Sequence, residues 1–396
     1  MTDQVQYDYD GLRRAATEEV TDRNCPQCGG VMLFSPELGM LKCPYCDSVK
    51  PIPKPTVEVE SGIPGIPGGS GISTLRLVID DKPREIALDL SDTALTANQD
   101  WGVAKKRIVC KNCGAEAIYD ELQHADKCPY CGSNQVMRTD SPNTMAPNGV
   151  VPFSISIQEA AAKFKSWLKG KFFTPTKAKQ SVNPDAFHGV YLPYWTFDAK
   201  TYSSYTARYG RDFTWQDEDG NLHTRTDWYA TSGTFSCAFD DELVAASTQH
   251  NEGFLRGVAP FDTNNAKVYQ PEYLAGFAAE RYSVGLKDGW RVAMNSMYGK
   301  VQSLIETKIR RENNADHVAN LSVHMDLSGV TYKYLLLPLW ISSFTYNGKL
   351  YQFMVNGQTG KVSGTAPVSG LRVALVILAV MLFFLLIFVG MGGGSY

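Results

Sequence analysis

Two clusters of cysteines constrain this chain more than any other feature of its sequence. Eight of the nine cysteines fall into two sets of identical spacing, in which fourteen residues separate two C-x2-C pairs. The sets are Cys25, Cys28, Cys43 and Cys46, and Cys110, Cys113, Cys128 and Cys131. Two such pairs supply the four thiolates of a closed tetrahedral Zn²⁺ site. The spacing therefore predicts two zinc ribbons, over residues 25–50 and 110–135, with two structural zinc ions as cofactors.

Other cysteine chemistry is the alternative to zinc. An iron–sulfur site or redox thiols would use the same side chains, but the exact duplication favours zinc. The first 24 residues are polar and acidic, without the apolar core of a secretory signal, so we expect an intracellular setting in which thiols stay reduced. Gly29 and Gly114 follow the first pair of each set, where a turn needs positive φ. Cys237 lies in a strand-like pattern and is predicted to be a small core residue.

A long apolar segment lies near the C-terminus. It covers Leu371–Val389 and carries one charge, Arg372, at its edge. As a helix it would be ~28 Å long, close to the roughly 30 Å hydrocarbon core of a bilayer, so the segment predicts a transmembrane helix, with a buried core helix as the alternative. Basic residues precede it and none follow. The positive-inside rule then predicts a single-pass, tail-anchored protein of the cytoplasmic membrane, with its N-terminal region in the cytoplasm and a short tail outside.

The rest of the chain divides by composition and pattern. Residues 1–24 are predicted to form an acidic flexible arm, 51–73 a Pro/Gly linker, and 74–109 a connector with short strands. Residues 150–361 are predicted to form an α+β domain rich in antiparallel sheet, and 362–370 a tether. The fold class that we expect is therefore α+β, with two small zinc ribbons and one C-terminal transmembrane helix.

Local signals define the elements of the α+β domain. They predict a helix from the capping box at Ser156 to about residue 168, long strands over 191–215 and 222–239, an amphipathic helix over 290–311, and a hairpin around Asn347-Gly348. The motif Leu192-Pro193-Tyr194-Trp195 is echoed by Leu337-Pro338-Leu339-Trp340. This echo suggests two similar halves, and coincidence between aromatic strands is the alternative.

A lysine-rich stretch follows the capping box. It contains Lys163, Lys165, Lys169, Lys171, Lys177 and Lys179, with few acids nearby. The simplest interpretation is a solvated helix face, and contact with anionic lipid headgroups or nucleic acid are the functional alternatives. The whole chain has 38 basic and 41 acidic residues and a net charge of −3. This balance excludes a generically basic nucleic-acid binder, so any such contact would be local.

Sequence signatures of catalysis are missing. The chain has no phosphate-binding loop, dinucleotide fingerprint, zinc-protease motif or nucleophile elbow, so we expect a protein that is not an enzyme. Four thiolates also leave a zinc ion no open position for water. Charges in the ribbons are sparse or mixed, which favours protein contact or bracing over phosphate binding. Tyr45 and Tyr130 could stack on bases or could cover the metal.

Several stretches carry a family resemblance. They are the ribbons CPQCGG…KCPYCDS and CKNCGAE…KCPYCGS, and the strings VPFSISIQEAAAKFKSWL, GVYLPYWTFDA, YQPEYLAGFAAERY and YNGKLYQFMVNGQTGKVSG. Together they resemble bacterial membrane-anchored zinc-ribbon proteins, often labelled transcription-factor-IIB-type zinc ribbon or primosomal-helicase-like. That family is associated with band-7 and phage-shock-type envelope stress proteins.

The resemblance implies a role in recruitment. A zinc-binding adaptor of this kind would bring band-7 or phage-shock-type protein partners to the cytoplasmic face of the membrane. The alternative is a zinc-ribbon nucleic-acid-binding protein that acts in replication or transcription at the membrane.

Overall fold

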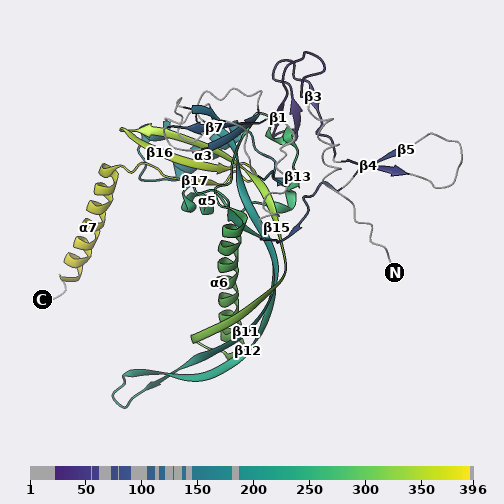
Figure 1. Cartoon of the computed structure of the whole chain (residues 1–396). Coiled ribbons are helices and arrows are strands. Elements are labelled where there is room, and N and C mark those ends of the chain that lie inside the picture. Colours follow the sequence, from purple (N-terminus) through teal and green to yellow (C-terminus); the bar gives the residue numbers. More distant parts are fainter. Residues whose placement is uncertain are drawn as a thin grey trace, which may run out of the picture.

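A head, a long β-arm and a projecting C-terminal helix make up the protein (Figure 1). The computed structural model describes residues 23–54, 56–61, 73–78, 80–90, 105–111, 116–120, 128, 136–139, 145–180 and 187–392. All but the last two residues of the predicted acidic arm, 1–24, lie outside these ranges.

A twelve-stranded mixed sheet organises the head and the arm. Its strands are β6 (Ile86–Ala87), β7 (Lys105–Cys110), β8 (Glu116–Asp120), β9 (Val136–Thr139), β10 (Gly149–Val150), β11 (His188–Gln216), β12 (Leu222–Ala245), β13 (Lys267–Val268), β14 (Ala278–Glu280), β15 (His317–Tyr346), β16 (Lys349–Asn356) and β17 (Val362–Gly364). The main path runs β13-β10-β15-β11-β14-β8-β7-β9. Strand β12 pairs with β11, β6 and β16 pair with β15, and β17 pairs with β16. Only the β10–β15 and β11–β14 pairs are parallel among these. The architecture is mixed α+β, as predicted.

Helices pack on this sheet or project from it. They are α3 (Ile157–Gly170), α4 (Thr176–Gln180), α5 (Glu252–Val258), α6 (Leu286–Asn313) and α7 (Gly370–Gly392), with 3₁₀ turns η2 (Thr263–Asn265) and η3 (Pro271–Leu274). The predicted capping box opens α3: the Glu159 N–H donates to Ser156 Oγ, and the Ser156 N–H donates to the Glu159 carboxylate. The predicted hairpin turn is also confirmed, because Asn347 and Gly348 both have positive φ, 50° and 74°, as a type I′ turn requires.

The β-arm consists of β11, β12 and β15 beyond the head, with α6 along one face (Figure 1). The turn between β11 and β12 closes as predicted, with the Asp217 N–H donating to the Asn221 carbonyl at 3.0 Å. Tyr205 and Ala207 of β11 pack against the buried side chains of α6. Those side chains recur every four residues over much of the helix, at Gly289, Ala293, Met297, Val301, Ile305 and Ile309. This apolar face is narrower than predicted, because Leu304 is 45% exposed.

The two Leu-Pro motifs meet at their first residues, where Leu192 of β11 pairs antiparallel with Leu337 of β15. The Trp195 indole N–H donates to the Val284 carbonyl at 2.8 Å, just before α6 begins. The Trp340 indole N–H donates to the Ile155 carbonyl at 3.2 Å, just before α3 begins. Each tryptophan thus anchors the entry to the helix of the other half. These reciprocal contacts agree with two similar halves, α3–β11–β12 and α6–β15–β16, which stay a prediction.

The N-terminal segments form small sheets of their own. One consists of β1 (Leu33–Ser35), β2 (Met40–Lys42) and β3 (Val49–Lys50), and the other of β4 (Thr56–Ser61) and β5 (Ser73–Val78). The predicted linker, 51–73, therefore contains strand β4, while residues 62–72 lie outside the described ranges. The predicted tether likewise contains β17, which pairs with β16.

The C-terminal apolar segment forms α7, but the prediction that it spans a membrane is wrong. Within the residues that the structure describes, no helix has both the length and the apolar character needed to cross a bilayer. Three further predictions rested on that helix: the single-pass, tail-anchored membrane localisation, the tail outside the membrane, and the membrane as a partner. They are wrong for the same reason.

Candidate metal centre

The first cysteine cluster is built from two turns of the same design. In the first turn, the Gly29 N–H donates to the Cys25 carbonyl at 2.8 Å, and Gly29 has the positive φ, 73°, that the sequence predicted. In the second turn, the Asp47 N–H donates to the Cys43 carbonyl at 3.1 Å, and Asp47 also has positive φ, 59°. The role of Asp47 was not predicted. Aspartate is one of the few residues besides glycine that tolerate this conformation.

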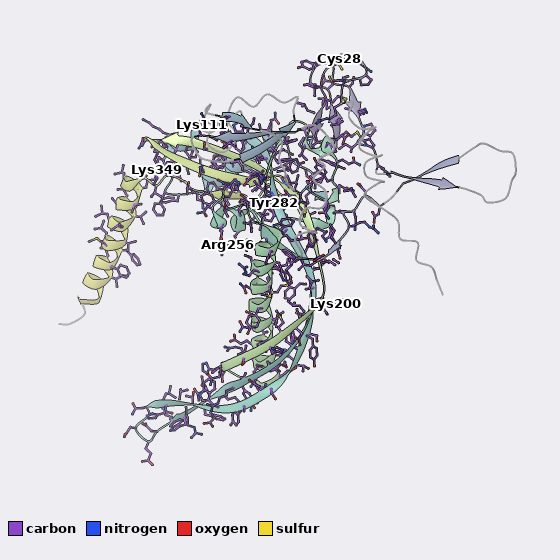
Figure 2. All side chains as sticks on the ribbon, in the orientation of Figure 1. Cys28, Lys111, Lys200, Arg256, Tyr282 and Lys349 are labelled. Carbon is purple, nitrogen blue, oxygen red and sulfur yellow. The ribbon has the colours of Figure 1, made fainter. Side chains whose placement is uncertain are left out.

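These turns bring the four sulfurs together at the end of the ribbon, where Cys28 lies (Figure 2). The Sγ atoms of Cys25 and Cys46 are 3.4 Å apart, and those of Cys28 and Cys43 are 3.5 Å apart. All four Sγ atoms lie within 4.8 Å of one another. Zn–S bonds of about 2.3 Å in a tetrahedron would separate the sulfurs by roughly 3.8 Å. The cluster can therefore bind a metal ion such as zinc.

The electrostatics of the thiols favour a cation. Burial raises the pKa of the Cys25 thiol, but hydrogen bonds, chiefly from the Cys28 backbone, outweigh it and lower that pKa to about 6. The Gly30 amide lowers the pKa of Cys28, but the adjacent sulfurs of Cys43 and Cys46 raise it to about 12. Negative charge on one sulfur thus opposes ionisation of its neighbours. A bound divalent cation would relieve that repulsion, and its binding would release protons.

The ribbon is docked on the head through Phe34. The Phe34 N–H donates to the Ala275 carbonyl at 2.9 Å. Its ring makes edge contacts with Tyr273 and Phe277, at centroid distances of 5.6 and 6.3 Å. The buried Cys25 and Cys43 belong to the same apolar cluster as the head core. A metal held by these cysteines would brace the fold, a role that the sparse ribbon charges also favoured.

The second cysteine set lies only partly within the described residues. Cys110, at the end of β7, and Cys128 are both buried, whereas Cys113 and Cys131 fall outside those ranges. Strand β7 pairs with β8 and β9, and β8 pairs with β14 of the head. This region is therefore an extension of the large sheet. Its four-thiolate site stays a prediction.

The predicted lysine cluster lies on α3, the turn after it and α4. Most of these side chains are exposed, and Lys179 is half-buried. Lys171 Nζ lies 4.7 Å from the centre of the Trp167 ring, and Lys179 Nζ donates to the Lys169 carbonyl at 2.8 Å. Exposed Phe172 adds an apolar side chain beside them. The lysines are thus distributed over α3, the turn after it and α4, and not along a single helix face.

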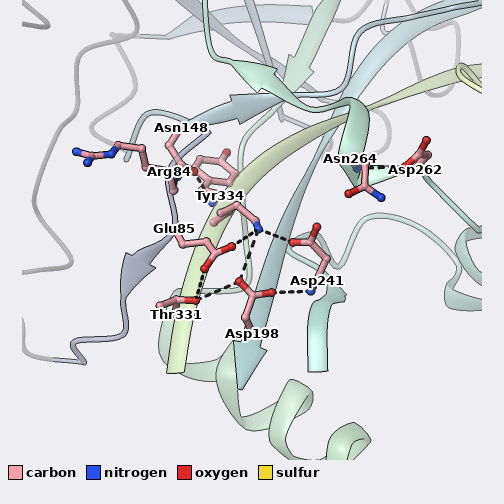
Figure 3. Close-up of polar contacts among 10 residues, drawn as sticks. Arg84, Glu85, Asn148, Asp198, Asp241, Asp262, Asn264, Thr331 and Tyr334 are labelled. Carbon is pink, nitrogen blue, oxygen red and sulfur yellow. Dashed lines mark hydrogen bonds and ion pairs between the residues drawn. The ribbon is translucent and has the colours of Figure 1, made fainter. Parts of the chain in front are cut away.

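A charged cluster at the root of the arm was missed by sequence reasoning (Figure 3). Lys333 Nζ lies 2.7 Å from Asp241 Oδ1, 3.4 Å from Glu85 Oε1 and 3.6 Å from Asp198 Oδ2. Burial lowers the pKa of Lys333, but the hydrogen bond to Asp241 and the three negative charges outweigh it, so that its pKa is raised. The carboxylates of Glu85, Asp198 and Asp240 also lie within 4.8 Å of one another. The Lys333 ammonium pairs with Glu85, Asp198 and Asp241, and these contacts fasten β11, β12 and β15 where they leave the head.

A second buried polar cluster was also missed. His250 Nε2 lies 2.6 Å from Glu280 Oε2, and the two side chains are 5% and 1% exposed. The Ser247 hydroxyl donates to the other carboxylate oxygen of Glu280. A nucleophilic serine would need its hydroxyl aimed at a base such as the imidazole. This arrangement fits a structural hydrogen-bonded cluster, and no sequence motif links the three positions.

Comparison with known proteins adds little about function. The chain is 27% identical over 354 residues to the uncharacterised protein YdjG of Bacillus subtilis (strain 168), covering 88% of this chain and 91% of that protein. No protein-family model matches the chain. No solved structure matches it.

Proposed function

We propose that this protein is a non-enzymatic, zinc-braced adaptor that binds protein partners through its arm. The observation that carries this proposal is the arm tip, residues 209–229, which lies at and beyond the end of α6. Three aromatic side chains on its inner face are between 42% and 50% exposed: Phe213, Trp215 and Tyr229. Exposed aromatic residues together with arginine are typical of protein interfaces.

The inner face of the tip, on the side where α6 packs, is left uncovered because α6 ends first. Arg211 Nε donates to the carbonyl of Asn313, the last residue of α6, at 2.8 Å. Phe213 and Trp215 follow on the same face, because alternate residues of a strand share a side. The Trp215 ring stacks on His223 at a centroid distance of 5.4 Å. The sequence contains a signal for this surface. Phe213 and Trp215 are two aromatic residues, two positions apart, in the part of the strand that the predicted helix is too short to cover.

The metal has a supporting role in this proposal. Four thiolates would close the coordination shell of zinc, so the ion stabilises a fold and leaves no position for substrate. The docking of Phe34 on the head supports bracing. Two zinc ions per chain, one for each cysteine set, is the finer form of the proposal.

Partner identity rests on the family resemblance alone, which points to band-7 or phage-shock-type proteins. The test is affinity capture of the full-length chain after chemical crosslinking in cells, with nuclease treatment before elution. A Phe213→Ser/Trp215→Ser variant should lose its protein partners. A Leu222→Ser variant is the matched control, since Leu222 is 74% exposed on the opposite face of the same hairpin. Partners retained by the double variant would contradict the arm as the binding surface.

Nucleic-acid binding is a second candidate, favoured by the lysine cluster. Six lysines without an acidic residue between them give a local positive surface. A protein that neutralises several phosphates loses about 10³-fold or more in affinity between roughly 50 and 200 mM salt. Changing Lys163, Lys165, Lys169 and Lys171 to Gln should therefore abolish any such binding. Tight binding at about 150 mM salt that depends on these lysines would favour this candidate over the adaptor.

A further inference from the structure

The two outer edges of the arm, β15 and β12, differ in how they are protected against pairing with another chain. On the β15 edge, the register with β11 shifts twice, and each shift adds one residue to β15. Left-handed residues lie at these shifts, Asn320 with φ 54° and Gly329 with φ 60°. Such bulges twist an edge strand and prevent it from pairing with another chain. The β15 edge is thus protected along the arm.

The β12 edge has no such protection. From Leu222 to Phe239 it pairs with β11 without a register shift, and its bulge lies only at the root, near Asp241. Residues 229–239, YATSGTFSCAF, contain neither a charged residue nor a proline. Within the described part of the chain, no strand pairs with the outer side of β12. A long, uncharged edge of this kind is a template for another strand.

The other half of the head shows how this position can be covered. Strands β12 and β16 occupy matching places: Ala246, after β12, donates its N–H to the Pro193 carbonyl, and Gly357, after β16, donates to the Pro338 carbonyl, both at 2.9 Å. The outer edge of β16 is paired with β17. Strand β12 has the same place in its half without the covering strand.

We propose that the β12 edge is a self-association surface, on which two copies of the chain pair their β12 strands antiparallel around a twofold axis near Gly233. The two three-stranded arms then form one continuous sheet. This contact is isologous and closes at a dimer. This dimer goes beyond the proposed adaptor function, because it presents two arm tips at once.

A second copy is the occupant that fits this edge. Antiparallel pairing of identical strands places the uncharged segment of one copy opposite that of the other, so no like charges meet. On the inner face, Phe235 and Cys237 are only partly buried against α6 and would gain cover from the added strand. The outer face presents Ser232, Thr234 and Ser236, small polar residues that suit a solvated sheet surface.

The test compares lysines on the two edges in the full-length chain, by sedimentation velocity over a concentration series in a mild detergent. The edge variant carries Ser232→Lys, Thr234→Lys and Ser236→Lys, at exposed positions. The control carries Ser322→Lys, His324→Lys and Ser328→Lys, at exposed positions on the same face of β15. We expect the unmodified chain and the control to form a dimer. For the edge variant, we expect the dissociation constant of the dimer to rise about tenfold or more, because lysines then oppose lysines.

A charge-complementation step makes the result specific. A second edge variant carries glutamate at positions 232, 234 and 236, and mixing it with the lysine variant should restore the dimer as a mixed species. A monomer at every concentration for the unmodified chain would overturn the proposal. So would an edge variant as dimeric as the control, or pairing of β12 only with a different protein.

Discussion

Single residues set the geometry of the metal centre. Gly29 and Asp47 adopt the left-handed conformation at equivalent points of the two turns, which lets each turn bond back to its own first cysteine. The role of Gly29 was predictable, because glycine adopts a positive φ more readily than any other residue type. Asp47 was not, since aspartate occurs in many other conformations. The buried pair of His250 and Glu280 was also beyond prediction, because the two residues are 30 positions apart and give no local signal.

Replacement of one buried ligand should remove one metal ion. Cys43→Ser substitutes a weak ligand for a thiolate and should lower the zinc content, measured by elemental analysis of full-length protein purified under reducing conditions, by one ion per chain. Cys237→Ser is the matched control, because Cys237 lies on β12 and its Sγ contacts Thr201 Oγ1 at 3.2 Å. Equal zinc content in the two variants would contradict the assignment.

Elements with strong local signals were predictable, and contacts between distant segments were not. The capping box of α3 and the type I′ turn after β15 each depend on a few adjacent residues, so both were found from sequence. The joining of β8 to β14 and the contact of Lys333 with Glu85, 248 residues away, depend on tertiary folding. The membrane span over Leu371–Val389 was predicted from the length and apolar character of the segment, and that prediction is wrong.

The charged cluster at the root of the arm should make the free energy of unfolding fall at alkaline pH. The pKa of Lys333 is raised in the folded protein, so its contribution is fully present below the unfolded pKa, near 10.4, and is lost as pH rises through the higher folded value. Lys333→Met leaves three carboxylates without their cation and should cost ~3 kcal/mol of unfolding free energy at neutral pH.

Denaturant unfolding across pH checks this prediction. The difference between Lys333→Met and the unmodified protein should stay constant from pH 7 to 9 and shrink only above about pH 10.4. Lys300→Met removes a surface lysine that pairs with Glu242 and is 54% exposed, so it should cost no more than about 1 kcal/mol. A difference that falls between pH 7 and 9 would argue against the raised pKa.

At the scale of the whole molecule, the braced ribbon and the arm lie at separate places on one head. The ribbon shares its core with the head, while the arm carries its exposed aromatic tip beyond the end of α6 (Figure 1). A rigid arm fastened at its root can present that tip at a fixed orientation, and a closed metal site needs no access to solvent ligands. This division of structure supports the proposed adaptor function.

Site-specific photocrosslinking in cells tests this account most directly. A photoreactive amino acid is placed in the full-length chain at Phe213 or Trp215, and at Leu222 as the control on the opposite face. The account predicts that both inner-face positions capture the same protein partner, that the capture survives nuclease, and that the Leu222 position captures it weakly or not at all. Capture of nucleic acid alone, or equal capture of protein at Leu222, would contradict it.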